Sequence, residues 1–594
     1  MRDMRNPENV LNSLSKHSGN LNYKFERLYR VLFNEEMFYV AYQNIYSKTG
    51  NMTAGVDGKT IDGMSIDRVE QLIGSLKNET YQPNPSKRTY IPKKNGKKRP
   101  LGIPSFNDKL VQEVVRMILS AIYEGSFEQA SHGFRPGRSC HTALISVQKS
   151  FTAVKWFIEG DIKGFYDNID HDVLIAILRE RIADERFLRL IRKFLNAGYV
   201  EDWVFHRTYS GTPQGGIVSP ILANIYLDKF DKYIREYIDR FNKGEIRKGN
   251  AQYKLYEQRR YRLAKKLKNE KDEKVREQMT AEIKRLREER NNYPARNEMD
   301  SSIKRLKYVR YADDFLIGIT GSLEDCKTVK EDIKNYLNEA LKLELSDEKT
   351  LITNAQKPAK FLGYDVFIRR CNDLRKDKFG RTVRAFGHKP VLYLNFETMR
   401  KKLFDYKAAR IAVVNGKEVW KSIVRTYMID LDDLEIVSQF NAEIRGFYNY
   451  YSIANNSHII NSFYHIMSYS MYKAFARKYK SSVKKILFKY KKGGTFKVAY
   501  ENSKGKTLYQ SFYHDGFKRK KVAGNIYCDA IPRTISITGG RNSLMERLKL
   551  QVCELCGATD KLEMHHVRKL KDLKGKSDWE KKMIARRRKT LAVC

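Results

Sequence analysis

The sequence LKYVRYADDFLIGI, residues 306–319, places two adjacent acids between two apolar runs that are typical of β-strands. This pattern predicts a β-hairpin with Asp313 and Asp314 at its tip. An Asp-Asp pair in a turn is more often a solvated loop, and burying two carboxylates among apolar flanks is costly unless cations compensate them. The role of these two acids therefore has to be inferred together with other motifs in the chain.

A third acid stands at the end of another apolar strand. The sequence WFIEGDIKGFY, residues 156–166, places Asp161 there. Nucleotidyl transfer needs carboxylates from separate strands, because two divalent cations about 4 Å apart must be bridged. One cation activates the attacking 3′-hydroxyl and the other stabilises the leaving pyrophosphate. Asp161, Asp313 and Asp314 together supply such a set.

Two further motifs fit a protein that handles nucleotides. Residues 209–220, YSGTPQGGIVSP, surround Gln214 with small residues that would let a nucleotide approach the backbone closely. Residues 88–104 hold two short strand-like runs around the turn KKNGKKR, which predicts a basic hairpin. Each motif alone is generic, but the two become specific when they occur in order with the three acids.

The composition is that of a globular chain whose partner is a polyanion. The 594 residues suffice for about four domains, and 113 Lys and Arg face 70 Asp and Glu, a formal charge of +43. The charge is spread along the chain without an amphipathic anchor, which favours nucleic acid over a membrane surface. No run of about 18 apolar residues and no signal peptide is found. The seven scattered cysteines favour a reducing compartment.

The composition and the apolar spacing of the sequence change several times along the chain. Apolar spacing over residues 23–46 predicts a helix near the start. Residues 234–305 are charged and poor in strand formers, which predicts an inserted helical arm or hairpin, a solvated helix pair without a role being the alternative. Residues 390–515 are expected to be helical and basic, with interleaved tyrosines that suit RNA binding but are also common in helical cores.

In this order the motifs resemble those of a group II intron-encoded protein, a reverse transcriptase joined to a maturase domain and an HNH-type endonuclease domain. The likeness covers essentially the full length. Besides the hairpin and the acids, it rests on SHGFRPGRSC at 131–140, LSDEKT at 345–350, FLGY at 361–364 and RGFYNYY at 445–451. The last of these and the Cys/His tail narrow the likeness from reverse transcriptases in general to this family.

The resemblance implies an α+β right-hand polymerase with fingers, a palm with a small antiparallel sheet and a helical thumb, followed by small DNA-binding and Cys/His ββα-metal endonuclease domains. The expected domains are an N-terminal RNA-binding extension (1–85), fingers and palm (86–385, with the insertion at about 234–305), a thumb or maturase domain (386–515), a DNA-binding domain (516–548) and an HNH-type endonuclease domain (549–594).

The resemblance also implies roles for single residues. Asp161 and Asp313 would hold two Mg²⁺ ions, with Asp314 as a supporting carboxylate. Arg99, with Lys93 or Lys97 nearby, would contact the triphosphate, and Gln214 would contact the nucleotide. Lys349 would be a proton donor or a mere surface lysine. Phe165 or Tyr166 would lie below the sugar, a choice that the sequence leaves open. RNA contacts are expected from Arg135, Arg138, Arg445, Tyr450 and Tyr451.

The tail carries a separate set of metal ligands. Cys553 and Cys556 form a CxxC knuckle, which suggests tetrahedral zinc, and Cys594 is a third thiol. The adjacent histidines His565 and His566 resemble a ββα-metal nuclease site. There His566 would be the general base and His565 a ligand of a catalytic divalent ion. A zinc knuckle that serves packing alone is the alternative. The family pattern continues into a second CxxC beyond Cys594, so we expect the endonuclease domain to be truncated.

The function implied is that of an RNA-directed DNA polymerase and maturase that binds group II intron RNA, assists its splicing and supports intron mobility by target-primed reverse transcription, with a DNA-nicking endonuclease. The alternative is a splicing-only maturase, against which the intact acids argue. The expected partners are intron RNA, target DNA and dNTPs, with no membrane and with an oligomeric state that the sequence does not indicate. A cytoplasmic ribonucleoprotein of bacterial type is the expected setting.

Overall fold

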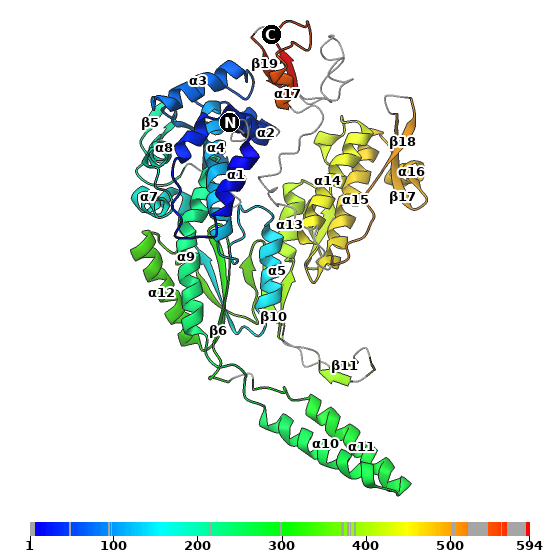
Figure 1. Ribbon diagram of the computed structural model, residues 1–594. Coiled ribbons are helices and arrows are strands. Elements are labelled where there is room, and N and C mark those ends of the chain that lie inside the picture. Colours follow the sequence, from blue (N-terminus) through cyan, green and yellow to red (C-terminus); the bar gives the residue numbers. More distant parts are fainter. Residues whose placement is uncertain are drawn as a thin grey trace.

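The computed structural model describes residues 6–46, 49–92, 96, 98–212, 215–297, 300–369, 374–376, 379–380, 382–384, 388–501, 505–520, 544–559, 561–566 and 590–594. A four-stranded antiparallel sheet lies near the middle of the molecule, in the order β6-β7-β3-β8 (Figure 1). Its strands are β3 (Trp156–Asp161), β6 (Arg305–Tyr311), β7 (Asp314–Thr320) and β8 (Leu351–Asn354). The hairpin predicted for residues 306–319 is confirmed.

Both faces of this sheet are covered, which explains why β7 is an almost continuous apolar run. Phe315 and Ile317 belong to one buried cluster, and Leu316 between them belongs to a second. This alternation follows from the two-residue period of a strand. The first cluster includes α9 (Ser219–Phe241) and α12 (Leu323–Leu341), and the second includes α5 (Cys140–Ser150) and the thumb.

A second sheet, in the order β2-β1-β4-β5, forms the fingers. Its strands are β1 (Ser86–Pro92), β2 (Lys98–Ile103), β4 (Tyr199–Glu201) and β5 (Val204–His206). The predicted basic hairpin is confirmed, since β1 and β2 pair antiparallel. The surrounding helices are α1 (Pro7–Lys16), α2 (Glu35–Tyr46), α3 (Ile66–Lys77), α4 (Phe106–Tyr123), α6 (Phe165–Asn168), α7 (His171–Arg179) and α8 (Glu185–Leu195), with 3₁₀ turns at 28–33, 49–52 and 124–126.

The single helix predicted over residues 23–46 is wrong. Phe25 instead pairs with Ile182 in an isolated β-bridge, a 3₁₀ turn follows at 28–33, and α2 begins only at Glu35. Arg27 takes a left-handed backbone conformation, with φ of 54°, which a continuing α-helix does not tolerate. The apolar spacing therefore reports burial, while the backbone turns between the buried residues.

The thumb is less helical than we predicted for residues 390–515, because small sheets accompany its helices. Its helices are α13 (Phe396–Asp405), α14 (Asp433–Tyr451), α15 (Ile460–Lys478) and α16 (Val483–Tyr490), with 3₁₀ turns at 426–428 and 457–459. The strands of this region are β13 (Lys389–Tyr393), β14 (Ala409–Val414), β15 (Lys417–Ser422), β16 (Lys491–Lys492), β17 (Thr495–Glu501) and β18 (Thr507–Ser511). Before it, the chain forms β9 (Ala359–Phe361), β10 (Tyr364–Arg369), β11 (Leu374–Lys376) and β12 (Thr382–Arg384).

Two parts project from this body at opposite ends of the view in Figure 1. The predicted helical insertion is confirmed as a hairpin of α10 (Ala251–Asn269) and α11 (Glu273–Asn291). At the other end lies the C-terminal module, formed by α17 (Leu544–Lys549), β19 (Glu563–His566) and β20 (Thr590–Val593).

The C-terminal module contacts the N-terminal helices. Met564 on β19 bridges to Met64, with 2.9 Å between its amide nitrogen and the Met64 carbonyl oxygen, and both side chains are fully buried. Lys549 on α17 pairs with Glu36 on α2. The mixed α+β class is confirmed, whereas the predicted domain boundaries stay predictions. Among the described helices, none has the length and apolar character needed to cross a bilayer.

Candidate active site

The three predicted acids meet at one edge of the central sheet. Asp161, the last residue of β3, lies directly opposite Asp314, the first residue of β7, in the antiparallel register. Asp313 stands beside them in the turn that joins β6 to β7. The strand order therefore brings side chains 152 residues apart in sequence (161 against 313) to one place.

The turn that carries Asp313 is held in an unusual backbone conformation. Ala312 has φ of 55°, in the left-handed region that costs a non-glycine residue about 1–2 kcal/mol. Gly133, from the fingers, lies against this turn so closely that a Cβ there would be 2.4 Å from the Ala312 nitrogen. Glycine at position 133 is therefore required by the approach of the two backbones.

Burial and mutual repulsion raise the pKa values of Asp313 and Asp314. Burial is the main cause for Asp313, with Asp161 adding to it, and burial followed by Asp313 and Asp161 raises the pKa of Asp314 to about 7. Two cations partly offset this effect: Lys349 Nζ lies 2.7 Å from Asp161 Oδ2, and the charges of Arg99 and Lys349 both favour the ionised form of Asp313. Three carboxylates together form the kind of oxygen-rich cluster that hard divalent cations bind.

A cavity of about 710 Å³ opens in front of the acids. The predicted nucleotide-binding residues among its lining are Arg99, Phe165, Tyr166 and Lys349. The other predicted contacts, Lys93, Lys97 and Gln214, lie outside the described residues. The space is large enough for a nucleotide, since ligand pockets usually measure about 300–1,000 Å³.

The two aromatic candidates below the sugar have different environments. Phe165 is 2% exposed and belongs to the core of the palm. Tyr166 is half-buried, lines the cavity, and its phenol is close enough to Asp313 and Arg99 for both charges to act on it. Burial, and then Asp313, raises the pKa of this phenol. The greater exposure of Tyr166 therefore favours it over Phe165 as the residue below the sugar.

Lys349 owes its position to a tight turn. The amide nitrogen of Ser346 lies 2.9 Å from the carbonyl oxygen of Asp161, so this loop is fixed to the end of β3. The bond to Asp161 raises the pKa of Lys349 and keeps it charged beside the acids. Its side chain is otherwise two-thirds exposed to the solvent.

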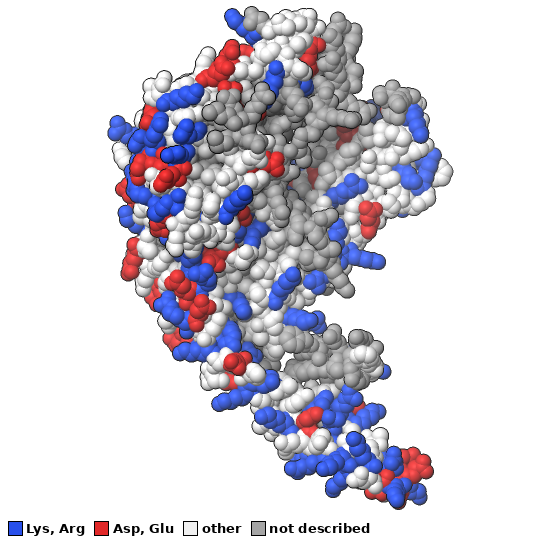
Figure 2. Space-filling view, in the orientation of Figure 1, with Lys and Arg blue, Asp and Glu red and all other residues white. Residues whose placement is uncertain are grey.

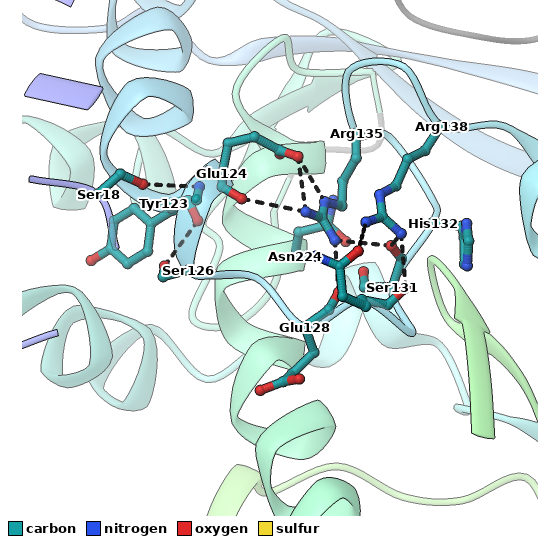
Figure 3. A network of polar contacts seen from close by, with 12 residues as sticks. Ser18, Tyr123, Glu124, Ser126, Glu128, Ser131, His132, Arg135, Arg138 and Asn224 are labelled. Atoms are coloured by element: carbon teal, nitrogen blue, oxygen red, sulfur yellow. Dashed lines mark hydrogen bonds and ion pairs between the residues drawn. The ribbon is translucent and has the colours of Figure 1, made fainter. Parts of the chain in front are cut away.

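Arg135 and Arg138 hold the fingers loop together (Figure 3). Arg135 is 3% exposed, and its Nε lies 3.0 Å from Glu124 Oε1, while its NH1 donates to the carbonyl oxygens of Glu128 and Ser131. Arg138 donates to the carbonyl oxygen of Gln129. Their guanidinium groups are engaged within the protein, so RNA binding by these two residues stays a prediction.

One residue of this region, Arg310, was not predicted from the sequence. Its side chain is fully buried in β6, with Nε 2.7 Å from Asp231 Oδ1, NH1 2.8 Å from the carbonyl oxygen of Ala312, and NH2 2.8 Å from Ser131 Oγ. Arg310 is one of three cations in β6, with Arg305 and Lys307, so its charge alone does not distinguish it in the sequence. Asn224 on α9 extends the network to the carbonyl oxygen of Gly133, 2.8 Å away.

The predicted RNA-binding residues of the thumb lie near its contact with the palm. Tyr450 donates its hydroxyl to the carbonyl oxygen of Leu362, 2.8 Å away, and Tyr451 is buried against Tyr364. Arg445 is exposed, with its guanidinium 5.4 Å from the centre of the Tyr513 ring. The tyrosines therefore fasten thumb to palm, and an RNA contact stays a prediction for all three residues.

The three predicted thiol ligands also meet. The sulfur atoms of Cys553, Cys556 and Cys594 lie within 4.8 Å of one another. The amide nitrogen of Cys556 lies 3.5 Å from Cys553 Sγ, as in a metal-binding knuckle, and backbone N–H groups, that of Cys556 foremost, lower the pKa of the Cys553 thiol to about 6. The set fits a thiolate-bound cation. His565 lies on β19, and the His566 side chain is outside the described residues.

Acids on adjacent antiparallel strands, a nucleotide-sized cavity before them and a covering fingers hairpin define a nucleic-acid polymerase of the right-hand class. Comparison with protein families agrees. The family "Reverse transcriptase (RNA-dependent DNA polymerase)" matches residues 91–256 and 286–366, "Type II intron maturase" matches residues 396–525, and "AI2M/AI1M-like, HNH endonuclease" matches residues 553–594.

Curated relatives extend the match over the whole chain. The group II intron-encoded protein LtrA of Lactococcus lactis subsp. cremoris is 44% identical, over 98% of this chain and 97% of LtrA. A 91 kDa protein in the cob intron of Schizosaccharomyces pombe is 37% identical, over 99% and 72% of the two chains. The putative COX1/OXI3 intron 1 protein of Saccharomyces cerevisiae is 32% identical, over 98% and 69%.

The chain belongs to the group II intron-encoded proteins. It is an RNA-directed DNA polymerase with a maturase region and an HNH endonuclease region, and it acts in group II intron mobility. Binding of intron RNA follows from the maturase and reverse transcriptase regions, and use of divalent metal ions follows from the polymerase and HNH regions.

Proposed function

We propose that Asp161 and Asp313 hold two Mg²⁺ ions, with Asp314 as the supporting carboxylate. We also propose that this site copies RNA into DNA from dNTPs. The supporting observation is the meeting of three acids, the half-buried Asp161 and Asp313 and the exposed Asp314, before one nucleotide-sized cavity. When bound, the ions supply activation of a 3′-hydroxyl and stabilisation of a leaving pyrophosphate.

The other residues of the cavity have separate tasks in this proposal. Arg99 offers a planar guanidinium to the triphosphate, which it binds in a two-pronged manner. Lys349, held charged by Asp161, lies where a phosphate leaving group would gain a proton or a counter-charge. Tyr166 forms the floor below the sugar, where bulk excludes a 2′-hydroxyl. Lys97 and Gln214 are proposed as further nucleotide contacts from the family motif alone.

The C-terminal module is proposed to nick target DNA and so to provide the primer. Cys553, Cys556 and Cys594 would bind Zn²⁺, with His565 as ligand of a second divalent ion and His566 as general base. Docking of this module on the N-terminal helices would hold nicking and copying in one particle. The described cysteines form no disulfide, which suits the reducing cytoplasm that we propose as the compartment.

Asp313→Asn tests the polymerase proposal. The change keeps the size of the side chain but removes a charged metal ligand, so primer extension on an RNA template should fall by at least about a thousandfold. Intron splicing assisted by the same variant should be largely retained, because the acid serves metal chemistry and not RNA docking. Asp347→Asn is the matched control, since Asp347 is an exposed acid on a nearby turn.

Two outcomes of this experiment would contradict the proposal. Unchanged extension by Asp313→Asn would show that the acids are not the catalytic centre. Loss of splicing together with extension would show that the two sites are not separate. A wild-type chain that splices but extends no primer would favour the splicing-only maturase.

A further inference from the structure

The arm of α10 and α11 has two faces of different charge. The charged residues that are exposed on α10 are all cations, namely Lys254, Arg259, Arg262, Lys265, Lys266 and Lys268. Those exposed on α11 are four cations and four acids, namely Lys274, Arg276, Lys284, Arg285, Glu273, Glu277, Glu282 and Glu288. The exposed face of α10, which we call the α10 face, therefore carries +6 and that of α11 carries no net charge.

The internal packing of the arm produces this difference. The acid of α10, Glu257, is directed into the arm, where it lies 2.6 Å from Arg260 and 2.6 Å from Arg290 of α11. These bonds, that to Arg260 first, lower the pKa of Glu257 to about 2. The ring of Tyr256 stacks on Tyr293 at 5.7 Å. The one acid is thereby neutralised inside the arm, and the six cations stay outside without an ion pair among the described residues.

The cations form two rows along one side of the helix. Lys254, Lys265 and Lys268 follow one row, which also holds Tyr261, a tyrosine that is 68% exposed. Arg259, Arg262 and Lys266 follow the next row at spacings of three and four residues. The helix has 19 residues and is therefore about 28 Å long. Rows of cations over this length, with an exposed aromatic ring, suit a nucleic-acid backbone.

The arm is fixed to the central sheet and not loosely tethered. At the root of the arm, the segments that enter and leave it are joined by a β-bridge between Gly249 and Arg296. A second β-bridge joins Lys243 to Lys304, directly before β6 begins at Arg305. β6 then leads to the turn that carries Asp313. Residues 257–285 are also outside the match to the reverse transcriptase family, so most of the arm is an addition to the common polymerase.

We propose that the α10 face binds the phosphate backbone of the intron RNA, an inference that rests on the maturase function. RNA is favoured over target DNA by position, because the arm projects from the end of the molecule opposite the C-terminal HNH module (Figure 1). Figure 2 shows Lys and Arg gathered along the visible side of the arm, with acidic side chains near its tip. The arm thus extends the RNA-binding surface away from the polymerase cavity.

Two variants of equal charge change test the proposal in the full-length chain. The α10 variant combines Arg259→Gln, Arg262→Gln, Lys265→Gln and Lys266→Gln. The control variant combines Lys274→Gln, Arg276→Gln, Lys284→Gln and Arg285→Gln on α11. Each variant loses four positive charges, and glutamine is a good helix former at exposed positions. Circular dichroism and thermal midpoints verify that both variants fold.

The probe is the transcript of the group II intron that encloses this reading frame, with the dissociation constant measured over a series of KCl concentrations. The α10 variant should bind at least tenfold more weakly near 100 mM salt, and the slope of log K against log salt should fall by about 3. The control should stay within about threefold of wild type. Equal effects of both variants, or none, would overturn the proposal while leaving the proposed function intact.

A crosslinking experiment separates RNA from DNA as the occupant. Tyr261→p-benzoylphenylalanine places a photoreactive ring in the row of Lys254, Lys265 and Lys268, in the chain bound to both intron RNA and target DNA. Crosslinks to RNA are the expected result. Crosslinks to DNA alone would assign the α10 face to the target and overturn the proposal. Failure of the wild-type chain to bind intron RNA at all would instead contradict the proposed function.

Discussion

Arg310 and Asp231 form an ion pair that is completely buried beneath the hairpin of β6 and β7, with 2.7 Å between Arg310 Nε and Asp231 Oδ1. Neither side chain has any exposed surface. The same guanidinium donates to the carbonyl oxygen of Ala312 and to Ser131 Oγ. One buried cation therefore joins α9, the fingers loop and the turn that carries Asp313, and it holds that turn in its left-handed conformation.

Arg310→Lys should impair catalysis by displacing the turn. Lysine keeps the charge beside Asp231 but cannot reach Ala312 and Ser131 at the same time, and each lost charge-assisted hydrogen bond is worth about 1.5–3 kcal/mol. We expect kcat of primer extension to fall about 10- to 100-fold and the Mg²⁺ concentration for half-maximal rate to rise. The KM for dNTP should change less, which a Mg²⁺ titration at saturating dNTP will reveal.

Tyr308→Phe provides the matched control for this change. The Tyr308 hydroxyl donates to Asp231 Oδ1 at 2.7 Å, so its removal disturbs the same buried acid but leaves the bonds of Arg310 intact. Its Mg²⁺ dependence should match that of wild type. If both variants shift the Mg²⁺ requirement equally, the effect is one of general stability, and a positioning role for Arg310 is excluded.

Tyr166→Ala should relax the discrimination between deoxyribonucleotides and ribonucleotides. The ring of Tyr166 lines the cavity, so its removal makes room for a 2′-hydroxyl below the sugar. We expect the ratio of rNTP to dNTP incorporation to rise at least tenfold, measured as kcat/KM for each nucleotide on one primer and template.

Phe165→Ala should have a different consequence. Phe165 is 2% exposed in the core, so its truncation should cost about 3–5 kcal/mol of stability with little change in sugar selection. A thermal-shift assay beside the incorporation assay distinguishes the two residues. Relaxed selection in Phe165→Ala and not in Tyr166→Ala would reverse this assignment.

The hairpin of β6 and β7 could be predicted because its signal is local. An apolar run on each side of Asp313 and Asp314 indicates two buried strands, and the motif order places Asp161 beside them. Arg310 could not be identified, because its partner Asp231 lies 79 residues away in sequence and a lone cation gives no sign of which acid it meets. Its role depends on tertiary packing alone.

Other differences have equally specific causes. The left-handed conformation of Arg27 divides the segment that was predicted as one helix, and no glycine or proline marks the break. In the thumb, β14 and β15 form a hairpin around Asn415 and Gly416, both with positive φ, a turn signal that stood within the helix-rich composition. Composition averages over such short elements, whereas the turn residues locate them.

Cys556→Ser should release the metal ion of the C-terminal module without loss of polymerisation. The sulfur of Cys556 lies 3.5 Å from that of Cys594, and Cys594 directly follows β20, which pairs with β19. Loss of one thiolate should lower bound zinc, measured by mass spectrometry, from about one equivalent to near zero. The unfolding transition of the module should also fall in temperature, because metal binding stabilises such small sites.

Primer extension by Cys556→Ser in Mg²⁺ should stay close to wild type, since the cluster lies outside the polymerase cavity. Cys140→Ser, at a thiol on α5 far from the cluster in sequence, is the control that should keep its zinc. Full zinc content in Cys556→Ser would show that the cluster holds no metal ion or holds it through other ligands.

His132 should make the stability of the fingers loop depend on pH. Burial, and then Arg138, lowers the pKa of His132 from 6.5 to about 3. The unfolded chain therefore binds a proton that the folded chain does not, so this contribution is complete above pH 6.5 and is lost as the pH falls toward 3. The loss should approach about 1.4 kcal/mol per pH unit within that window.

His132→Asn isolates this contribution from that of other titrating groups. An asparagine oxygen can occupy the place of Nδ1, which lies 2.9 Å from Thr142 Oγ1, but it does not titrate. Urea unfolding at pH 7.5, 6.5 and 5.5 should show a shallower decline in the variant than in wild type. Identical declines would mean that His132 is already protonated in the folded chain. A buried imidazolium among Arg135, Arg138 and Arg310 would then need an acid partner, which the described residues around it do not supply.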